Sequence, residues 1–378
     1  EPRCFLGSFD FSWEQRKVQD VADRFDNLRI PVAANLRVHG TTPYYGANGI
    51  QDYVEGFTHD GEFVLVAEDG ANDLKNYPVK CVNGRIWVNN HAHVLQGKAG
   101  IADNSFLAFA ISQSDIESLL VGGGRAKLNA ETLMSIEFRL PCLQEQYRIG
   151  EYLTQLDHLI TLHQRKFEKL TNVKKSMLEK MFPQNGSSYP EIRFKGFTDP
   201  WEQRKLGDVA TFINGRAYSQ PELLSSGKCK VLRVGNFYTN DSWYYSDLEL
   251  GEKYYADYGD LLYTWSATFG PHIWLGDRVI YHYHIWKIDL SNQLEKQFAV
   301  QLLEQDKANI LSSKNGSTMV HITKEGMEQK DVIIPPSTKE QQEIGAFFQQ
   351  LDNLITLHQR ELEKLQNIKK SMLEKMFV

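Results

Sequence analysis

The sequence lacks the features that mark secreted or membrane proteins. No stretch approaches the ~18 apolar residues of a membrane-spanning helix, and the first residues have neither a basic leader nor the apolar run of a signal peptide. Only 4 cysteines occur in 378 residues and none forms a Cys-x-x-Cys pair, which argues against a disulfide framework and a zinc ribbon. We therefore expect a cytoplasmic protein with buried or indifferent thiols.

Several catalytic signatures are missing as well. The chain has no G-x-x-x-x-G-K-[ST] loop for nucleotide phosphates, and Gly122-Gly123-Gly124 lacks the spacing of a dinucleotide fingerprint. Pro335-Pro336 lacks the flanking residues of the amino-methyltransferase motif, and neither H-E-x-x-H nor G-x-S-x-G occurs. The sequence therefore contains none of these catalytic motifs.

Positive charge is scarce, because 42 Lys and Arg stand against 48 Asp and Glu and give a formal net charge of -6. Nucleic-acid binding depends on Lys and Arg that neutralise phosphates, so an acidic chain needs a local basic surface for it. Residues 156–182 are a candidate for this basic surface, since six Lys or Arg and three acidic residues give the segment a charge of +3.

A long internal repeat is the strongest feature of the sequence. Residues 156–182 recur at 351–377 with 22 of 27 positions identical, at an offset of 195. Trp-Glu-Gln-Arg-Lys at 13–17 recurs at 201–205, and His91-Ala92-His93 is echoed by His282-Tyr283-His284. Between these segments the two halves are almost unrelated. This order predicts two variable domains of one architecture, each followed by a constant segment.

The constant segments are predicted to be long helices. Both show the 4-3-4-3 spacing of a coiled-coil seam. We expect helices 151–183 and 346–378 to pack as an antiparallel coiled coil, with the first ending at Pro183 and a linker over 184–200. The predicted seam residues are Leu156, Ile160, His163, Phe167, Leu170, Met177, Leu351, Ile355, His358, Leu362, Leu365 and Met372.

A second interpretation of these helices stays open, in which each packs only on its own domain. Lys174 and Lys369 occupy seam positions, which slightly favours it. A long lysine stem can nevertheless cover apolar surface while its charge stays at the rim.

Short strand-like runs bounded by Gly, Asn and Asp fill the variable segments. They include residues 63–67, 86–88 and 93–95 in the first segment and 231–234, 261–263 and 279–281 in the second. Each segment also holds one helical stretch, at 104–120 or 294–311. We predict an α+β fold: two domains of mixed, mostly antiparallel sheet plus helices, at 1–150 and 201–345, separated by the long helices.

Two loops in each domain are rich in residues that read base edges or hold phosphates, at 41–49 and 89–91 and at 214–219 and 264–270. Asn and Arg can make bidentate contacts in the major groove of DNA, while Ser and Thr hold phosphates. With neighbouring polar and basic positions they predict DNA contacts at Thr42, Tyr44, Tyr45, Asn48, Asn90, His91, Arg125, Lys127, Asn214, Arg216, Tyr218, Arg233, Asn236, Trp265, Ser266 and Thr268.

The two His-x-His pairs lie within predicted strands and allow two interpretations. Residues i and i+2 of a strand share one face, and two imidazoles there could hold a metal with one or two carboxylates. Aromatic neighbours such as Trp87, Tyr281 and Trp286 favour histidines packed on a sheet with hydrogen-bonded rings. We therefore predict no metal site.

Together these segments resemble the specificity (S) subunits of type I restriction-modification systems. The resemblance rests on the repeated variable domain and constant helix, Trp-Glu-Gln-Arg-Lys at each domain start, Glu-Gln-x-x-Ile-Gly at 145–150 and 340–345, and the closing Lys-Lys-Ser-Met-Leu-Glu-Lys-Met-Phe. It covers essentially the whole chain. It implies that each target-recognition domain reads one half of a split site in double-stranded DNA, and that the helices set the gap.

The resemblance also implies partners and cofactors. Two methyltransferase (M) subunits would dock on the helices, and restriction-translocase (R) subunits would join through the complex. S-adenosylmethionine, ATP and Mg²⁺ would be bound by these partners and no cofactor by this chain. Segments similar to two different recognition-domain types, one of them at 316–321, imply an asymmetric site and add Ser317 and Thr318 to the DNA contacts.

Two other functions compete with this interpretation. A DNA-modifying enzyme with an unrecognised motif would methylate or cut DNA as the purified chain alone. An interaction scaffold, in which the helices form a dimerisation rod, would not bind one split DNA sequence.

Overall fold

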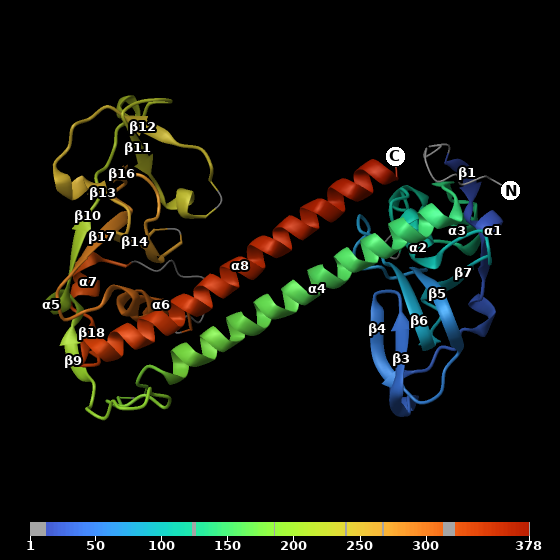
Figure 1. Cartoon of the computed structure of the whole chain (residues 1–378), viewed down its shortest axis with the longest axis horizontal. Helices are drawn as coiled ribbons and strands as arrows, with labels where there is room; N and C mark the ends of the chain where they lie inside the picture. The colour runs from blue at the N-terminus through green and yellow to red at the C-terminus, as the bar shows by residue number, and fades with distance from the viewer. Residues whose placement is uncertain are drawn as a thin grey trace. The chain divides into compact units, whose positions relative to one another are not determined.

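The computed structural model describes residues 13–122, 126–184, 186–238, 240–266, 268–312 and 322–377. The chain forms two compact units, and the first joins the described residues up to Gln164 with those from Arg360 onwards. The unit boundaries fall inside the two longest helices, α4 (Leu143–Lys180) and α8 (Thr338–Met376) (Figure 1). Each unit therefore holds one variable domain and a part of both helices. Among the described residues, no helix is long and apolar enough to cross a membrane.

A six-stranded sheet forms the first domain, in the order β2-β7-β5-β6-β3-β4. Neighbouring strands are antiparallel except for the parallel pair β3 and β6. The strands are β2 (Ala22–Arg24), β3 (His39–Gly46), β4 (Gly49–Val54), β5 (His59–Ala67), β6 (Val79–Val88) and β7 (Ala92–Gly97). Val64 and Leu95 pack against Leu107 of helix α2 (Asn104–Ser112) in a buried core.

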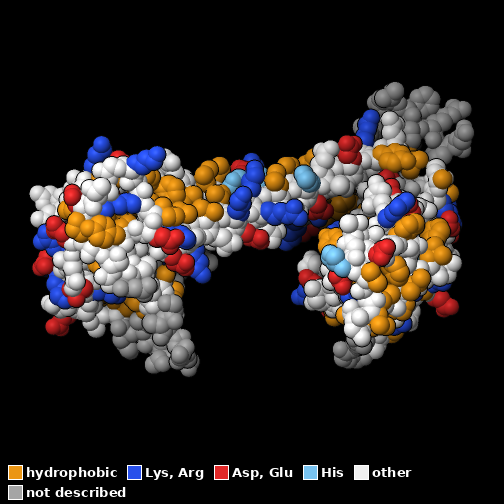
Figure 2. All heavy atoms as spheres, turned by 90° about the horizontal axis from the view of Figure 1, so that it is seen from below, with side chains coloured by type: hydrophobic (Ala, Val, Ile, Leu, Met, Phe, Trp, Pro, Cys, Tyr) orange, Lys and Arg blue, Asp and Glu red, His pale blue; other side chains and the backbone are white. Residues whose placement is uncertain are grey.

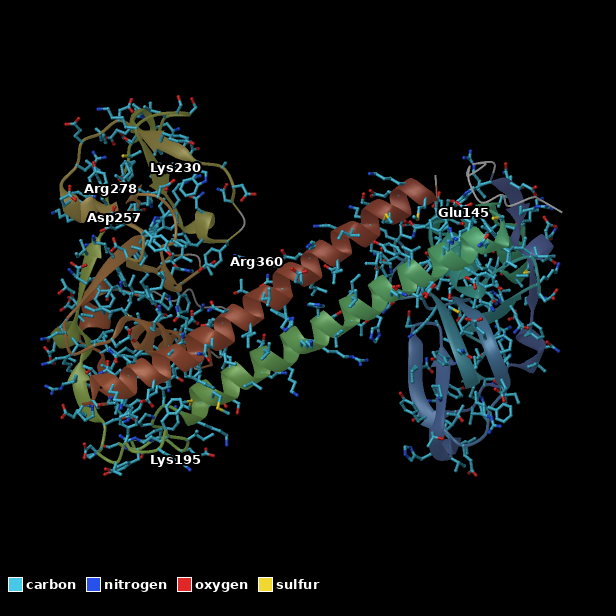
Figure 3. The ribbon with its side chains drawn as sticks, in the orientation of Figure 1. Glu145, Lys195, Lys230, Asp257, Arg278 and Arg360 are labelled. Carbon is cyan, nitrogen blue, oxygen red and sulfur yellow. The ribbon has the colours of Figure 1, made fainter. Side chains whose placement is uncertain are left out.

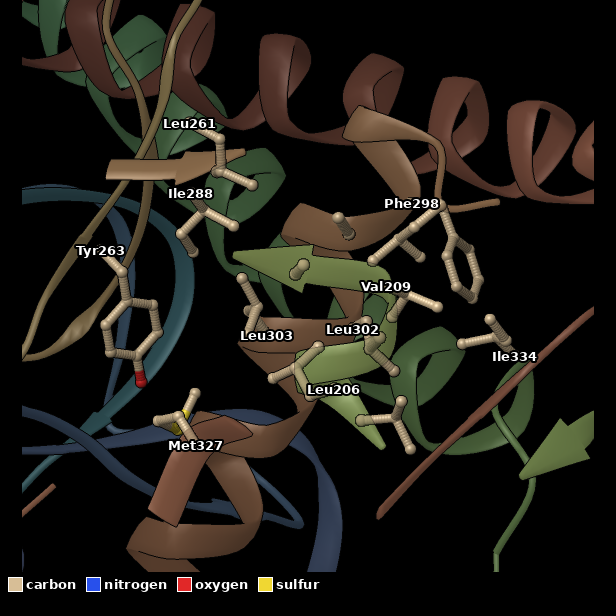
Figure 4. Close-up of a cluster of buried hydrophobic side chains, with 14 of the residues drawn as sticks. Leu206, Val209, Leu261, Tyr263, Ile288, Phe298, Leu302, Leu303, Met327 and Ile334 are labelled. Atoms are coloured by element: carbon tan, nitrogen blue, oxygen red, sulfur yellow. The ribbon is translucent and has the colours of Figure 1, made fainter. Parts of the chain in front are cut away.

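Two four-stranded sheets form the second domain, in the orders β10-β17-β14-β15 and β12-β11-β16-β13. Their strands are β10 (Ala210–Asn214), β11 (Cys229–Leu232), β12 (Tyr244–Ser246), β13 (Tyr255–Ala256), β14 (Leu261–Thr264), β15 (Gly270–Ile273), β16 (Val279–Tyr281) and β17 (Ile285–Leu290). Among the described strands of these two sheets, only β11 and β16 pair in parallel. Leu261, Ile288 and Leu303 belong to the core between the first sheet and helix α6 (Lys296–Ser312) (Figure 4). The predicted mixed, mostly antiparallel fold is confirmed.

The remaining elements are short. Two strand pairs flank the domains: β1 (Glu14–Lys17) with β8 (Glu137–Leu140), and β9 (Glu202–Lys205) with β18 (Asp331–Ile334). The short helices are α1 (Val18–Val21), α3 (Ala130–Ser135), α5 (Leu206–Val209) and α7 (Lys324–Glu328). The repeated Glu-Gln-Arg-Lys is thus an equivalent strand in both domains.

The repeated tryptophan packs at the centre of an aromatic triplet in each unit. In the first unit, Trp13 lies 5.8 Å from Phe106 and 6.1 Å from Phe377 between ring centroids. In the second unit, Trp201 lies 5.8 Å from both Phe298 and Phe182. Phe377 closes the second constant segment and Phe182 the first. Each domain is therefore completed by the end of the constant segment that follows the other domain.

The long helices pack against each other in both units. In the first unit, Leu153 and Leu156 near the start of α4 share a cluster with Leu365 and Met372 near the end of α8. In the second unit, Met177 near the end of α4 packs on the core that contains Phe348 near the start of α8. The start of one helix thus meets the end of the other, which is the predicted antiparallel pairing. All twelve predicted seam residues are buried or half-buried.

The two seam lysines join the helices. Lys369 Nζ lies 2.5 Å from Asp157 Oδ1, and Lys174 Nζ lies 2.5 Å from Asp352 Oδ1. The interpretation in which each helix packs only on its own domain is therefore wrong. Each lysine reaches an acidic side chain of the other helix instead of turning its charge to solvent.

Both long helices begin eight residues before the expected starts at 151 and 346, because Glu-Gln-x-x-Ile-Gly forms their first turns. The Gln341 side chain accepts from Glu295 N at 2.8 Å and donates to Gln293 O and Pro335 O, each at 2.9 Å. Gln146 makes the same three bonds in the first unit. A Cβ on Gly345 would lie 2.8 Å from Phe298 N, so glycine lets α8 approach α6. This motif fixes the helix on its domain.

The expected helical stretch 104–120 ends early, at Ser112. Ser114 Oγ donates to Ala110 O at 3.3 Å, and Asp115 Oδ1 accepts from Ser118 N at 3.3 Å. Such short polar side chains compete with helical backbone bonds, so the chain turns there. The other expected stretch, 294–311, matches α6 closely.

Candidate nucleic-acid interface

In the first domain, three loops that follow strands β3, β5 and β6 are bonded together. We call the surface that these loops form the edge of the domain. The turn between β3 and β4 is tied to the loop after β5, because Asn48 Nδ2 donates to Gly70 O and Asn48 Oδ1 accepts from Asn72 N, each at 2.9 Å. The loop between β6 and β7 joins them, since Asn89 N donates to Tyr45 O at 3.0 Å. These loops form one polar rim that carries the predicted residues Asn48, Asn90 and His91.

A charged network lies beneath this rim. Glu68 accepts from Arg29 Nη1 at 2.6 Å and pairs with Lys127 Nζ at 2.8 Å, while His93 Nδ1 lies 2.7 Å from Asp26 Oδ2. Burial alone would raise the pKa of Asp26, but the bonds from His93 and from the Val94 amide hold it below its usual value. Ion pairs and hydrogen bonds thus join the loop after β5 and the segment after β2 to β7.

The histidines of the first pair have separate roles. His93 is buried, and its Nε2 lies 2.9 Å from Leu128 O, so both ring nitrogens have hydrogen-bond partners, as predicted. His91 lies in the turn before β7, where its Nδ1 is 2.5 Å from Asp69 Oδ1 and its side chain is 38% exposed. His91 is therefore the one of the two that faces the surface.

The second domain builds a comparable edge where β14 ends and β17 begins, because His282-Tyr283-His284 leads into β17 as its echo His91-Ala92-His93 leads into β7. Arg216 N donates to Tyr281 O at 3.2 Å, Tyr283 N donates to Arg216 O at 3.0 Å, and Trp265 N donates to His284 O at 3.1 Å. A Cβ on Gly215 would lie 2.4 Å from His282 O, so only glycine allows this loop to approach the turn. The predicted loops 214–219 and 264–270 are thus brought together by residues 282–284.

Aromatic rings crowd this second edge. Trp265 stacks on Trp286 at 5.8 Å between centroids, and its indole N–H donates to Tyr283 O at 2.9 Å. Tyr218 stacks on His282 at 6.4 Å. Burial lowers the pKa of His282 to about 4, with smaller contributions from His284 and Arg233, so this imidazole is neutral at pH 7. The edge offers neutral aromatic surface beside arginine.

The prediction that both His-x-His segments lie within strands is wrong for His91, which lies in the turn before β7, and for all of His282-Tyr283-His284. These residues follow β16, which ends at Tyr281, and precede β17, which begins at Ile285. Because β16 and β17 belong to different sheets, the chain must turn between them.

The predicted DNA-contacting residues fall into three groups in the described part of the chain, and a fourth lies outside it. Tyr44 and Tyr45 are buried at 1% and 7% exposure, and the Tyr44 hydroxyl bonds to Val32, so we leave both out of the proposed interface. The side chains of a second group, Asn48, Asn236, Lys127 and Arg233, form hydrogen bonds or ion pairs with Gly70, Asn240, Glu68 and Ser242, respectively. The third group is exposed or half-buried: Thr42, Asn90, His91, Asn214, Arg216, Tyr218, Trp265, Ser266 and Thr268. Of these, His91, Arg216 and Trp265 also bond to Asp69, Glu222 and Tyr283. Arg125, Ser317 and Thr318 lie outside the described residues.

Sequence reasoning missed one prominent residue of the second edge. Glu222 Oε1 lies 2.6 Å from Arg216 Nη2, and Glu222 Oε2 accepts from the amide and hydroxyl of Ser219 at 2.8 and 2.9 Å. The sequence did contain a signal for Glu222, because the spacing Ser219-x-x-Glu222 is that of a capping box. In the structure this capping box begins the short helix η4 (Gln220–Glu222).

The long helices carry a second kind of surface. Leu159 and Leu162 of α4 are 40% and 38% exposed, and their repeat equivalents on α8, Leu354 and Leu357, are 44% and 51% exposed. None of these four belongs to the predicted seam. Figure 2 shows hydrophobic side chains beside Lys and Arg on the surface of the long helices. Each unit therefore has an exposed leucine pair at the same point of the repeat.

The sequence of the chain is similar to a known protein family and to known relatives. The model of the type I restriction modification DNA specificity domain matches residues 12–172 and 198–367. A Haemophilus influenzae protein described as a type I restriction enzyme specificity subunit is 32% identical over 351 residues, which cover 91% of this chain and 89% of that protein. The MjaVIII specificity subunit of Methanocaldococcus jannaschii is 24% identical over 398 residues, which cover 96% and 91%.

A solved structure agrees on the fold. The S subunit of a type I restriction-modification system from M. genitalium aligns with a TM-score of 0.71 at 14% identity, over 99% of this chain and 98% of that one. With its two matched specificity domains and a relative above 30% identity along nearly its whole length, the chain belongs to the family of type I restriction-modification specificity subunits.

Proposed function

We propose that this chain reads DNA sequence without catalysing a reaction, and that each domain contacts one half of an asymmetric bipartite site in duplex DNA. One observation carries this proposal: the two domains present equivalent sheet edges built from different side chains. The first edge carries Asn90 and His91, whereas the second carries Arg216, Trp265 and Tyr283. Different donors and acceptors on equivalent edges would select different bases.

The chemistry of methylation and cleavage then belongs to partner subunits. The described cysteines Cys81, Cys142 and Cys229 are free thiols, and no described group of three His, Cys, Asp or Glu could hold a metal. S-adenosylmethionine would bind to the methyltransferase subunits, and ATP and Mg²⁺ to the restriction-translocase subunits. This chain would select where they act and hold no cofactor.

The exposed leucine pairs support docking of two methyltransferase subunits. Apolar side chains that are exposed at the same repeat position in both units suit two copies of one partner. Leu159 and Leu162 would form one docking site, and Leu354 and Leu357 the other. The helices that carry these sites would also set the gap between the two half-sites.

The central experiment is co-expression of the full chain with its methyltransferase subunit, followed by mapping of modified bases across the genome. We expect one split motif with two unlike halves and a fixed gap. Methylation or cleavage by the purified chain alone would indicate a DNA-modifying enzyme. Failure of the complex to bind a split sequence specifically would indicate an interaction scaffold.

Docking is tested by the mass of the reconstituted complex. Changing Leu159 and Leu162 to Ser should remove one methyltransferase subunit, and changing Leu354 and Leu357 to Ser should remove the other. Leu275→Ser is a matched control, because Leu275 is 68% exposed and lies outside the long helices in sequence, in the loop between β15 and β16. Two bound subunits in both double variants would rule out these docking sites.

A further inference from the structure

Arg216 is held more firmly than an ordinary surface arginine. Its amide and carbonyl bond to Tyr281 O and Tyr283 N, so its backbone is fixed between the last residue of β16 and the following turn. Gly215, beside it, packs so closely on His282 O that no side chain fits there. The side chain is 30% exposed. The loop therefore presents the Arg216 guanidinium from a fixed point on the edge.

Glu222 fixes the direction of that guanidinium. Its Oε1 takes a bond of 2.6 Å from Arg216 Nη2, while its Oε2 is held by the Ser219 amide and hydroxyl. The guanidinium carbon also lies 5.1 Å from the Tyr218 ring centroid. Both carboxylate oxygens of Glu222 are thus hydrogen-bonded. Glu222 is therefore held in one position and restricts the orientation of the Arg216 guanidinium.

The guanidinium still lacks an acceptor. Arg216 Nη1 is shielded from solvent and has no hydrogen-bond partner among the described residues, and the same holds for the Tyr218 hydroxyl and Arg233 Nε. A donor without a partner is destabilising. Because Nη1 is shielded in this structure, an acceptor would approach the exposed 30% of the Arg216 side chain, and a shift of the guanidinium on binding would then give Nη1 its missing partner. DNA offers such acceptors on its phosphates and on its base edges.

Charge decides between these two kinds of acceptor. The bond from Arg216, followed by those from Ser219, lowers the pKa of Glu222 to about 2, so this carboxylate is charged at pH 7. A phosphate at Arg216 would lie next to that charge and compete for the same donor. The edge of guanine is neutral and presents two acceptors, O6 and N7, which match arginine.

From this geometry we propose that Arg216 contacts a guanine in the half-site of the second domain, and that Glu222 is the positioning residue that aims it. The proposal rests on the proposed function and names one base of the sequence that this domain reads.

The test uses the full chain in complex with its methyltransferase subunits and duplex DNA carrying its mapped site. Each guanine of the second half-site is replaced in turn by 7-deazaguanine, which lacks the N7 acceptor. We expect one replacement to weaken binding roughly 10- to 100-fold. The same replacement should cause no further loss in Arg216→Ala, because the contact is already absent.

Glu222→Gln tests the positioning role. It should relax the preference for guanine at that one position and leave the first half-site unchanged. Ser219→Ala is the structural comparison, since it weakens the same cap but keeps the Arg216–Glu222 pair. Glu252→Gln is the matched control, because Glu252 pairs with Arg278 at 2.6 Å near the start of β16, where Figure 3 shows Arg278 beside Asp257.

Several outcomes would overturn the proposal. One is equal weakening on all sequences in Arg216→Ala, which would make Arg216 a phosphate contact. Another is a second half-site in which no 7-deazaguanine affects binding. A third is an unchanged preference for guanine in Glu222→Gln. Absence of any sequence-specific binding by the wild-type complex would instead refute the proposed function.

Discussion

Lys369 of the second repeat forms an ion pair with Asp157 of the first, with 2.5 Å between Nζ and Oδ1. Under the offset of 195, this pair is equivalent to Lys174 with Asp352. The same two repeat positions therefore join the helices in both units. A lysine at a seam position thus fixes which residues of the two helices face each other.

Charge reversal tests this register. Asp157→Lys would place two lysines together in the first unit and should destabilise it by roughly 0.5–1 kcal/mol, because the pair is partly exposed. Adding Lys369→Asp should recover most of the loss by restoring opposite charges. Urea unfolding of the two variants gives both values. No recovery in the double variant would show that the pair does not stabilise the helix contact.

The aromatic triplets predict that a change in one constant segment destabilises the domain of the other half. Phe182 is 1% exposed and packs on Trp201 and Phe298, so Phe182→Ala should cost about 3–5 kcal/mol. Hydrogen exchange should rise in the second domain, although Phe182 follows the first. Phe377→Ala is the matched variant and should raise exchange around Trp13 and Phe106. Exchange that rises in the domain preceding the mutated segment would contradict this.

The two ion pairs also define how the helices can be lengthened. In sequence, Arg165 lies midway between Asp157 and Lys174, and its repeat equivalent Arg360, labelled in Figure 3, lies midway between Asp352 and Lys369. Inserting one heptad after each arginine keeps the seam and adds about 10 Å, or roughly three base pairs at 3.4 Å each.

The preferred gap between half-sites should then grow by about three base pairs, with the same bases read. The preferred gap is measured by methylating DNA substrates whose half-sites are fixed and whose gap varies. A heptad in α4 alone is the control and should disrupt assembly, since both helices run through both units. An unchanged gap in a folded double insertion would show that the helices do not set the spacing.

His272 makes the stability of the second domain depend on pH. Burial, with a smaller contribution from Lys307, lowers the pKa of His272 to about 4, against about 6.5 in an unfolded chain. Between pH 6.5 and pH 4 the unfolded chain binds a proton at this histidine and the folded domain does not. The free energy of unfolding therefore falls as the pH falls, by up to about 1.4 kcal/mol per pH unit. Thermal unfolding from pH 7 to 4 should therefore show a shallower decline in His272→Gln. Parallel declines would assign the pH dependence to other groups.

The sequence was sufficient for features that depend on local periodicity. The 4-3-4-3 spacing around Leu156 and Leu351 predicted both long helices, and the repeat predicted their pairing. The aromatic triplets could not be predicted, because Trp13 and Phe377 meet only after the whole chain has folded.

The recognition edges were predicted less well, since composition does not reveal burial. Tyr44 lies in a loop-like run of Thr, Pro and Gly, yet its ring is buried in β3, with Arg37 over it at 4.1 Å. Glu222 was overlooked because the predicted DNA contacts included no acidic side chain. Its capping-box spacing from Ser219 was visible in the sequence.

The exchange of helix ends between the halves has a consequence for biosynthesis. The ribosome makes the first domain long before residues 365–377, which cover Phe106, Leu153 and Leu156 in the folded unit. During that interval this apolar surface has no permanent cover. The second domain meets the opposite situation, because Phe182 is synthesised before the Trp201 and Phe298 that receive it. The half that is translated first is therefore the half that finishes folding last.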